Sequence, residues 1–147
     1  QNPVNYINLS SLSKIFELCK DKFQIVYNRP SSTDITNDAS PQRVWSDWNL
    51  AEKMGIPLMQ DFQKDYQLDY NTTQMAVLSN CNHHISTQGG NSALAAYFGG
   101  ENIIYGVKGY EVKHKSYERF FPKLSGQKIY HVETYDDLIK KVESYVN

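Results

Sequence analysis

The sequence predicts an α/β fold: a three-layer, Rossmann-like sandwich in which a mostly parallel sheet of about five strands carries helices on both faces. Strand-like apolar runs alternate with amphipathic helical runs along the chain, and parallel strands need such crossover connections. A length of 147 residues suits one domain and is short for two. With 40% hydrophobic and 21% charged residues, the composition is that of a globular protein. We therefore expect one Rossmann-like domain over residues 1–147.

The elements of the amino-terminal half follow from apolar spacing and from turn residues. They are, in order, a helix over 12–19, a strand over 23–27, a loop over 31–43, a helix over 44–54 and a strand over 56–60. Ser10 or Ser11 is placed to cap the first helix, and Gly55 closes the second. Pro57 indicates the beginning of a strand or a sheet edge, because proline cannot donate to the ladder.

The carboxyl-terminal half alternates more regularly. Its predicted elements are a helix over 71–81, a strand over 83–87, a helix over 91–98, a strand over 102–107, a helix over 117–124, a strand over 128–132 and a final helix with its apolar stripe at 138, 139, 142 and 146. Asn71 opens a capping-box pattern, and Thr134 with Asp137 can cap the last helix. Parallel strands put their carboxyl ends along one rim, where ligands of such sheets bind.

The glycine turn between the strand over 83–87 and the helix over 91–98 is the main candidate site. Two glycines permit positive φ and close approach of a ligand, and a capped helix start offers N–H groups to a diphosphate. Asn91 or Ser92 can cap the helix, and Gln88 offers an amide to a sugar hydroxyl or a base edge. A plain strand-to-helix connection is the alternative. The predicted ligand-binding residues here are Thr87, Gln88, Gly89, Gly90, Asn91 and Ser92.

Two further candidates follow other strands on the same rim. Asn28 and Arg29 begin a loop that continues through Asp34, and an arginine there can pair bidentately with a phosphate. Tyr110 and Glu111 follow the strand over 102–107. A solvent-facing arginine and a mobile surface loop are the respective alternatives.

The run from Ile85 to Gly100, followed by Ile103-Ile104-Tyr105, resembles the donor-binding domain of GT-B glycosyltransferases, in the style of the heptosyltransferase, fucosyltransferase and polyol-phosphate transferase branches. The resemblance implies that the turn from Gln88 to Ser92 faces the diphosphate or the transferred sugar of a nucleotide-sugar donor. It also implies that Tyr110 and Glu111 lie near the base or ribose, that transfer needs no metal or other cofactor, and that an N-terminal acceptor domain is the partner. Many relatives have an acidic residue where this chain has Gln88, and no catalytic residue is identified.

Charge and cysteine usage bear on other function classes. A net charge of −1 without a basic stripe gives nucleic-acid binding no electrostatic support. No run approaches the roughly 20 apolar residues of a membrane span, and no secretory signal is visible. Cys19 and Cys81 are far apart and lack metal-type spacing, so we expect a reducing, cytoplasmic location and no metal. The alternative functions are a non-catalytic, flavodoxin-like binding or regulatory module, and a polyol-phosphate, glycerophospho- or pyruvyl-transferase domain.

Overall fold

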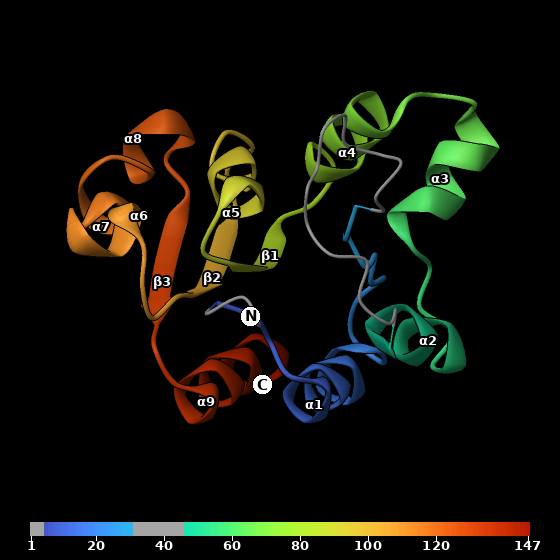
Figure 1. Ribbon diagram of the computed structural model, residues 1–147, viewed down its shortest axis with the longest axis horizontal. Helices are drawn as coiled ribbons and strands as arrows, with labels where there is room; N and C mark the ends of the chain where they lie inside the picture. The colour runs from blue at the N-terminus through green and yellow to red at the C-terminus, as the bar shows by residue number, and fades with distance from the viewer. Residues whose placement is uncertain (1–4, 31–45) are drawn as a thin grey trace.

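The computed structural model describes residues 5–30 and 46–147, and a parallel sheet of three strands lies within them (Figure 1). The strands are β1 (His83–Thr87), β2 (Glu101–Tyr105) and β3 (Lys128–Val132), in the spatial order β1-β2-β3. Both pairings are parallel, so the three carboxyl ends share one edge of the sheet. The α/β class with a parallel sheet is therefore confirmed.

Helices cover both faces of this sheet, as predicted. On one face lie α1 (Leu9–Cys19) and α9 (Tyr135–Val146); on the other lie α5 (Gly90–Ala95), α6 (Tyr110–Lys113), α7 (Ser116–Arg119) and α8 (Pro122–Ser125) (Figure 1). Alternate residues of β2 point to opposite faces. Ile103 and Tyr105 accordingly pack against Leu138 and Val142 of α9 in the main apolar cluster, which also includes Cys19 of α1.

The other face of the sheet is tied to α5 by polar side chains. The Ser86 hydroxyl donates to Asn102 Oδ1 (3.0 Å), and Asn102 Nδ2 donates to Gln127 Oε1 (3.2 Å). Gln127 Nε2 then donates to the carbonyl oxygens of Ala95 (2.8 Å) and Gly99 (2.7 Å). Because Asn102 and Gln127 are almost fully buried, each of these bonds replaces one that water would otherwise make.

The two strands predicted over 23–27 and 56–60 are not formed. A single parallel bridge joins Tyr27 to Leu58, through the Tyr27 N–H to the Pro57 carbonyl and the Met59 N–H to the Tyr27 carbonyl, both 2.9 Å. The described residues therefore form three of the roughly five strands expected, and the predicted strand count is not reached.

Local capping explains why the second of these segments becomes helical. The Asp61 carboxylate accepts a hydrogen bond from the Leu58 N–H (2.7 Å), so α3 (Met59–Tyr66) begins directly after Leu58. Pro57 also supplies no N–H to a neighbouring strand. Before α3 only about one extended residue, Leu58, is left to pair with the segment over 23–27, so the two segments form a single bridge and no β-ladder.

The helices of this half begin at other caps than predicted. Asn8, and neither Ser10 nor Ser11, caps α1, because its side chain accepts the Ser11 N–H (2.8 Å). The Asp69 carboxylate caps α4 (Tyr70–Leu78) by accepting the Thr72 N–H (3.0 Å) and its hydroxyl, which lowers the pKa of Asp69. The second helix is α2 (Ser46–Lys53), and the loop predicted over 31–43 lies outside the described residues.

The carboxyl-terminal half agrees closely with prediction. Thr134 caps α9, and its hydroxyl oxygen accepts the Asp137 N–H (3.1 Å). One difference is the helix predicted over 117–124, which is split into α7 and α8. Pro122 contributes to the break, because it has no N–H to continue the hydrogen bonding of α7 and instead takes the first position of α8.

Candidate ligand-binding cavity

A cavity of about 1250 Å³ runs along the edge of β1 that faces away from β2. It is walled by α1, residues 23–30, α3, α4 and the start of α5. Within the described ranges no strand pairs with this edge of β1. The side chains of Phe16, Ile25 and Ile85 make part of its lining apolar.

Polar residues at the carboxyl end of β1 line the same cavity. Thr87 and Asn91 come from β1 and α5, and Asn28 and Arg29 come from the segment that precedes α2. Two clusters that are about sixty residues apart in the sequence are thus brought to one cavity. Four of the ten predicted ligand-binding residues contribute to it.

The amide of Asn28 is held by two buried side chains of α4. Asn28 Nδ2 donates to Gln74 Oε1 (2.8 Å), and the Tyr70 hydroxyl donates to Asn28 Oδ1 (2.5 Å). Tyr70 and Gln74 are 4% and 7% exposed, so this contact fixes the segment before α2 against α4. The sequence analysis missed both partners, because nothing local in the sequence indicates a contact across more than forty residues.

Arg29 is positioned by Asp47 at the start of α2. Its guanidinium donates to the Asp47 carboxylate, which also accepts the Tyr27 hydroxyl (2.8 Å). Burial, with Asp47 nearby, raises the pKa of Tyr27 well above its ordinary value, so the phenol remains a donor. Gln60 Nε2 further donates to the Arg29 carbonyl (2.9 Å). Arg29 therefore lines the cavity with its guanidinium held in place by Asp47.

The glycine turn begins α5 without a side-chain cap. Gly89 is the N-cap residue with φ of 140°, a conformation that a side chain rarely adopts. Asn91 and Ser92, which were predicted to cap the helix, do not cap it. The buried Ser92 hydroxyl instead donates to the Gly89 carbonyl (2.8 Å). No hydrogen bond joins the N–H of Gly89 or Gly90 to another described residue. A Cβ placed on either glycine would meet open space.

Gln88 faces the loop after β2 and is absent from the cavity lining. Its Oε1 accepts from Asn5 Nδ2 (2.7 Å), and its Nε2 donates to the Glu111 carboxylate. Gly106 and Gly109 pass so close that a Cβ on either would lie 2.8 Å or less from the Gln88 side chain. The structure therefore joins the predicted residues Gln88 and Glu111, and adds Asn5, which no local sequence pattern indicates.

Tyr110 lies apart from both groups. It is 77% exposed, and its ring stacks on His114 with centroids 6.1 Å apart. It lines a second hollow of about 470 Å³, formed by residues 107–110 together with Val112 and Lys113.

His84 is a buried histidine in the lining of the large cavity. Burial lowers its pKa below the ordinary 6.5, and a backbone interaction with Cys81 opposes part of that shift. As the pH falls below about 6.5, the unfolded chain takes up this proton before the folded chain does, so the free energy of unfolding falls.

We expect this loss in urea unfolding between about pH 7 and about pH 5, and we expect it to be smaller in His84→Gln. Equal pH dependence in His84→Gln and the unsubstituted protein would contradict the assignment.

Among the described residues, no three histidine, cysteine, aspartate or glutamate side chains gather as a metal site would require. In the same residues, none of the helices combines the length and the hydrophobicity that crossing a bilayer demands. Comparison with protein-family models, with curated proteins and with solved structures returns no match to this chain.

Proposed function

We propose that this chain is the donor-binding domain of a GT-B-type glycosyltransferase and that it binds the diphosphate of a nucleotide sugar at the polar end of the large cavity. The observation that carries the proposal is the convergence of Asn28 and Arg29 with Thr87 and Asn91 on one cavity. Ligands of open parallel sheets bind outside the carboxyl ends of the strands, and Thr87 is the last residue of β1.

The size and lining of the cavity suit such a donor. Ligand pockets usually enclose about 300–1,000 Å³ and combine apolar walls with a few placed polar groups. At about 1250 Å³ this cavity has room for a nucleotide with its sugar. Phe62 and Tyr66 of α3, whose rings stack with centroids 6.4 Å apart, line it as well and offer a surface for a base.

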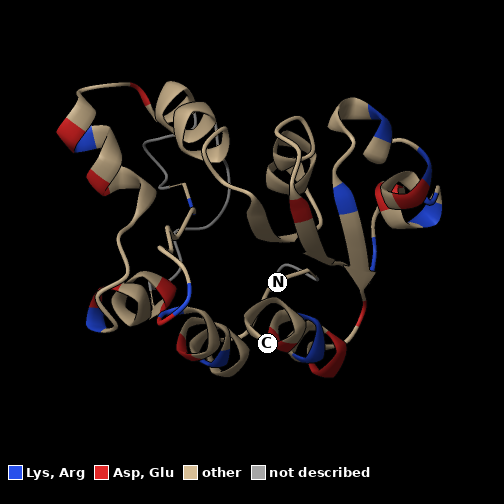
Figure 2. Cartoon of the chain, turned by 180° about the vertical axis from the view of Figure 1, so that it is seen from behind, with Lys and Arg blue, Asp and Glu red and all other residues tan. Residues whose placement is uncertain are grey.

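Little negative charge opposes an anion at the β1 end of the cavity, because the lining carboxylate of Asp47 is paired with Arg29. Arg29 is the cation and Asp47 the carboxylate among its described lining residues. As Figure 2 shows, β1, α4 and α5 carry neither Asp nor Glu, so no carboxylate on them repels a diphosphate. Thr87 and Asn91 add polar side chains at this end, whereas Gly89, Gly90 and Ser92 are absent from the cavity lining.

The five-stranded sheet of the family remains part of this proposal. Residues 23–30 line the same cavity as β1, and the parallel bridge between Tyr27 and Leu58 joins them to the segment before α3, which supports a position on the β1 side for the two missing strands. In the proposed sheet the segment over 23–27 would lie next to β1, which would bring Asn28 beside Thr87 at the carboxyl end, the usual ligand position.

In the proposed reaction the sugar moves to an acceptor and the nucleoside diphosphate departs. The negative charge that develops on the departing diphosphate is stabilised by the Arg29 guanidinium and by the side-chain amide of Asn91, both of which line the cavity. The acceptor and the general base are supplied by a second domain, and no metal or other cofactor takes part. The described residues thus act by binding and by charge stabilisation.

The test is titration of the full chain with nucleoside diphosphates, nucleotide sugars and inorganic phosphate, followed by calorimetry and by chemical shifts. Saturable binding of a nucleoside diphosphate or its sugar, tighter than that of inorganic phosphate, supports the proposal. If no member of the panel binds, the donor-domain proposal fails, and the non-catalytic module of the sequence analysis becomes the better hypothesis. Preference for a polyol phosphate over nucleotides would favour the related transferase instead.

Asn91→Asp gives a sharp variant for this test. It adds a negative charge at the start of α5, where an acidic residue stabilises the helix, so the fold should be kept. Two unit charges 4 Å apart interact by about 1 kcal/mol in water and about 4 kcal/mol near a protein surface, so we expect at least about tenfold weaker binding of the diphosphate.

Asn82→Asp is the matched control, because Asn82 also lines the cavity but precedes β1. The four residue steps of β1 span about 13 Å, beyond the screening length of about 8 Å. Its affinity should therefore be nearly unchanged. Equal affinity of the two variants would show that the anion binds elsewhere.

A further inference from the structure

We propose that the outer surface of α6–α8, together with the end of α5, docks on an anionic membrane surface. This basic aromatic surface is independent of the donor cavity. Its exposed apolar residues are Tyr97, Val107, Tyr110, Phe120 and Leu124, and its exposed cations are Lys108, Lys113, Lys115, Arg119 and Lys123.

The charge of the chain is unevenly distributed. Residues 106–126 hold five Lys or Arg against two Glu, a net charge of +3, whereas the remainder holds ten against fourteen, a net charge of −4. None of these five cations forms an ion pair with a described residue, although cations elsewhere, such as Arg29 and Lys128, do. The positive charge of this segment is therefore left facing solvent, where it can attract an anionic surface.

The same segment exposes large apolar side chains. Tyr110, Tyr97 and Phe120 are 77%, 61% and 57% exposed. Leu124 and Val107 are 43% and 40% exposed, and Val107 borders the shallow hollow of residues 107–113. Single exposed apolar residues are ordinary, but several within one short stretch of chain indicate an interaction surface.

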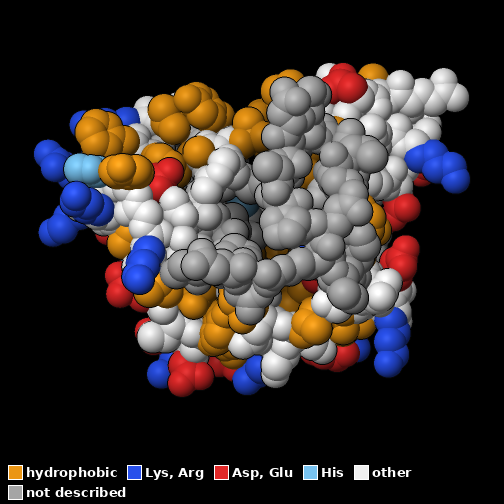
Figure 3. Space-filling view, in the orientation of Figure 1, with side chains coloured by type: hydrophobic (Ala, Val, Ile, Leu, Met, Phe, Trp, Pro, Cys, Tyr) orange, Lys and Arg blue, Asp and Glu red, His pale blue; other side chains and the backbone are white. Residues whose placement is uncertain are grey.

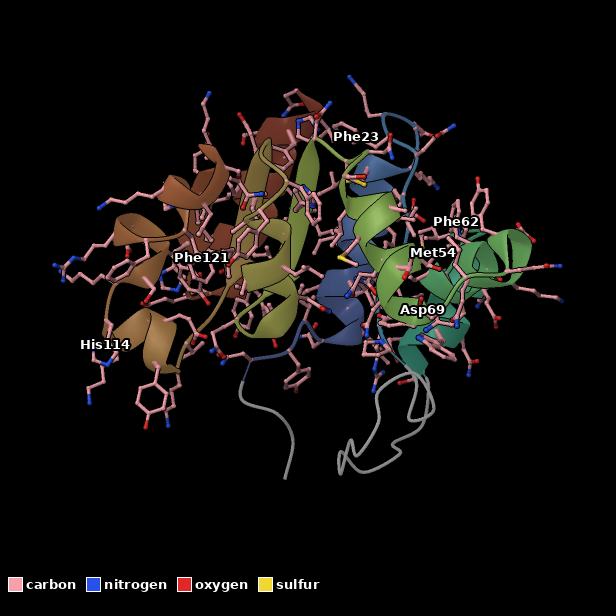
Figure 4. All side chains as sticks on the ribbon, turned by 90° about the horizontal axis from the view of Figure 1, so that it is seen from above. Phe23, Met54, Phe62, Asp69, His114 and Phe121 are labelled. Atoms are coloured by element: carbon pink, nitrogen blue, oxygen red, sulfur yellow. The ribbon has the colours of Figure 1, made fainter. Side chains whose placement is uncertain are left out.

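The fold gathers these residues on one side of the molecule. The Ser125 hydroxyl donates to the Ala96 carbonyl and accepts the Gly99 N–H (2.9 Å), so the end of α8 lies against the end of α5 and next to Tyr97. Figure 3 shows apolar side chains over α5 to α8, bordered by Lys and Arg at the outer edge. In Figure 4 charged side chains of α6–α8 extend away from the sheet, on the side marked by His114.

A membrane fits this combination better than nucleic acid does. Aromatic rings settle at the lipid headgroup level, aliphatic side chains insert beneath it, and each Lys or Arg near an anionic surface adds attraction. Nucleic acid also attracts lysines and stacks on aromatic rings, but Leu124 and Val107 offer it nothing to stack on. Two separate features, charge and apolar exposure, therefore point to lipid.

The experiment is co-sedimentation of the full chain with two kinds of vesicle, one of phosphatidylcholine alone and one with equal parts of phosphatidylcholine and phosphatidylglycerol. We expect binding to the phosphatidylglycerol vesicles that weakens with added salt, and little binding to phosphatidylcholine. Replacing Lys113 and Lys115 with Gln should weaken it by about tenfold or more. Phe120→Ala with Tyr110→Ala should weaken it without altering the salt dependence.

The control replaces two exposed lysines outside this surface, Lys53 of α2 and Lys64 of α3, with Gln. It makes the same change in net charge and should leave vesicle binding unchanged, while circular dichroism verifies that every variant is folded. The proposal is overturned if neither vesicle binds, if the control loses as much affinity as the Lys113 and Lys115 variant, or if polyuridylate RNA binds more tightly than the anionic vesicles. None of these outcomes depends on nucleotide-sugar binding.

Discussion

Replacing Gly100 with Ala is expected to lower the free energy of unfolding by about 3 kcal/mol or more. Gly100 has φ of 70°, and a Cβ on it would lie 2.3 Å from the carbonyl oxygen of Asn82. That oxygen accepts the Glu101 N–H (2.8 Å) immediately before β1 and β2 begin to pair. The backbone must therefore shift where the register of the sheet is set. Urea unfolding followed by circular dichroism measures the loss.

Gly126→Ala is the control that separates two costs of Gly100→Ala, the steric clash of the new Cβ and the cost of positive φ in a residue other than glycine. Gly126 has a similar φ of 75°, but a Cβ there would meet nothing within 4 Å. We expect this control to lose only the left-handed penalty of about 1–2 kcal/mol. If the two variants lost the same stability, the close approach of Gly100 to Asn82 would carry no energetic weight.

Gln127→Leu is the second substitution with a large expected effect. Gln127 is 1% exposed and accepts from Asn102 while donating to the carbonyls of Ala95 and Gly99. Leucine has a similar volume but leaves all three of these groups without that partner. Each buried unsatisfied group costs about 1–3 kcal/mol, so we expect a loss of about 3 kcal/mol or more in urea unfolding.

An exposed glutamine provides the comparison. Gln24→Leu should change the free energy of unfolding by no more than about 0.5 kcal/mol. A double variant, Asn102→Leu with Gln127→Leu, should lose less than the sum of the two single variants, because the groups of one network are coupled. Additive losses would indicate that Asn102 and Gln127 stabilise the fold independently.

The carboxyl-terminal half was predictable because its signals are local. β2 and β3 are short segments rich in Ile, Tyr and Val, β1 is a short segment directly before the glycine turn, and Thr134 indicates the start of α9 directly. The alternation of these elements was enough to predict a parallel sheet with helices on both faces. Here the local pattern and the tertiary structure agree.

The remainder depends on contacts that a linear pattern does not contain. Residues 23–27 read as a strand, yet they make a single bridge, because α3 starts directly after Leu58. The contact of Gln88 with Asn5 crosses 83 residues. The candidate site was therefore predicted as separate segments, and their meeting in one cavity emerged only from the fold.

The packing of α1 against α9 has a consequence for the order of folding. Ile15 and Leu138 belong to one apolar cluster although more than a hundred residues separate them, whereas β1 and β2 pair across eighteen. Loop-closure entropy makes the longer contact costlier by about 2 kcal/mol. Since distant contacts also slow folding, the sheet with its crossover helices should assemble as an early nucleus, with α1 docking last.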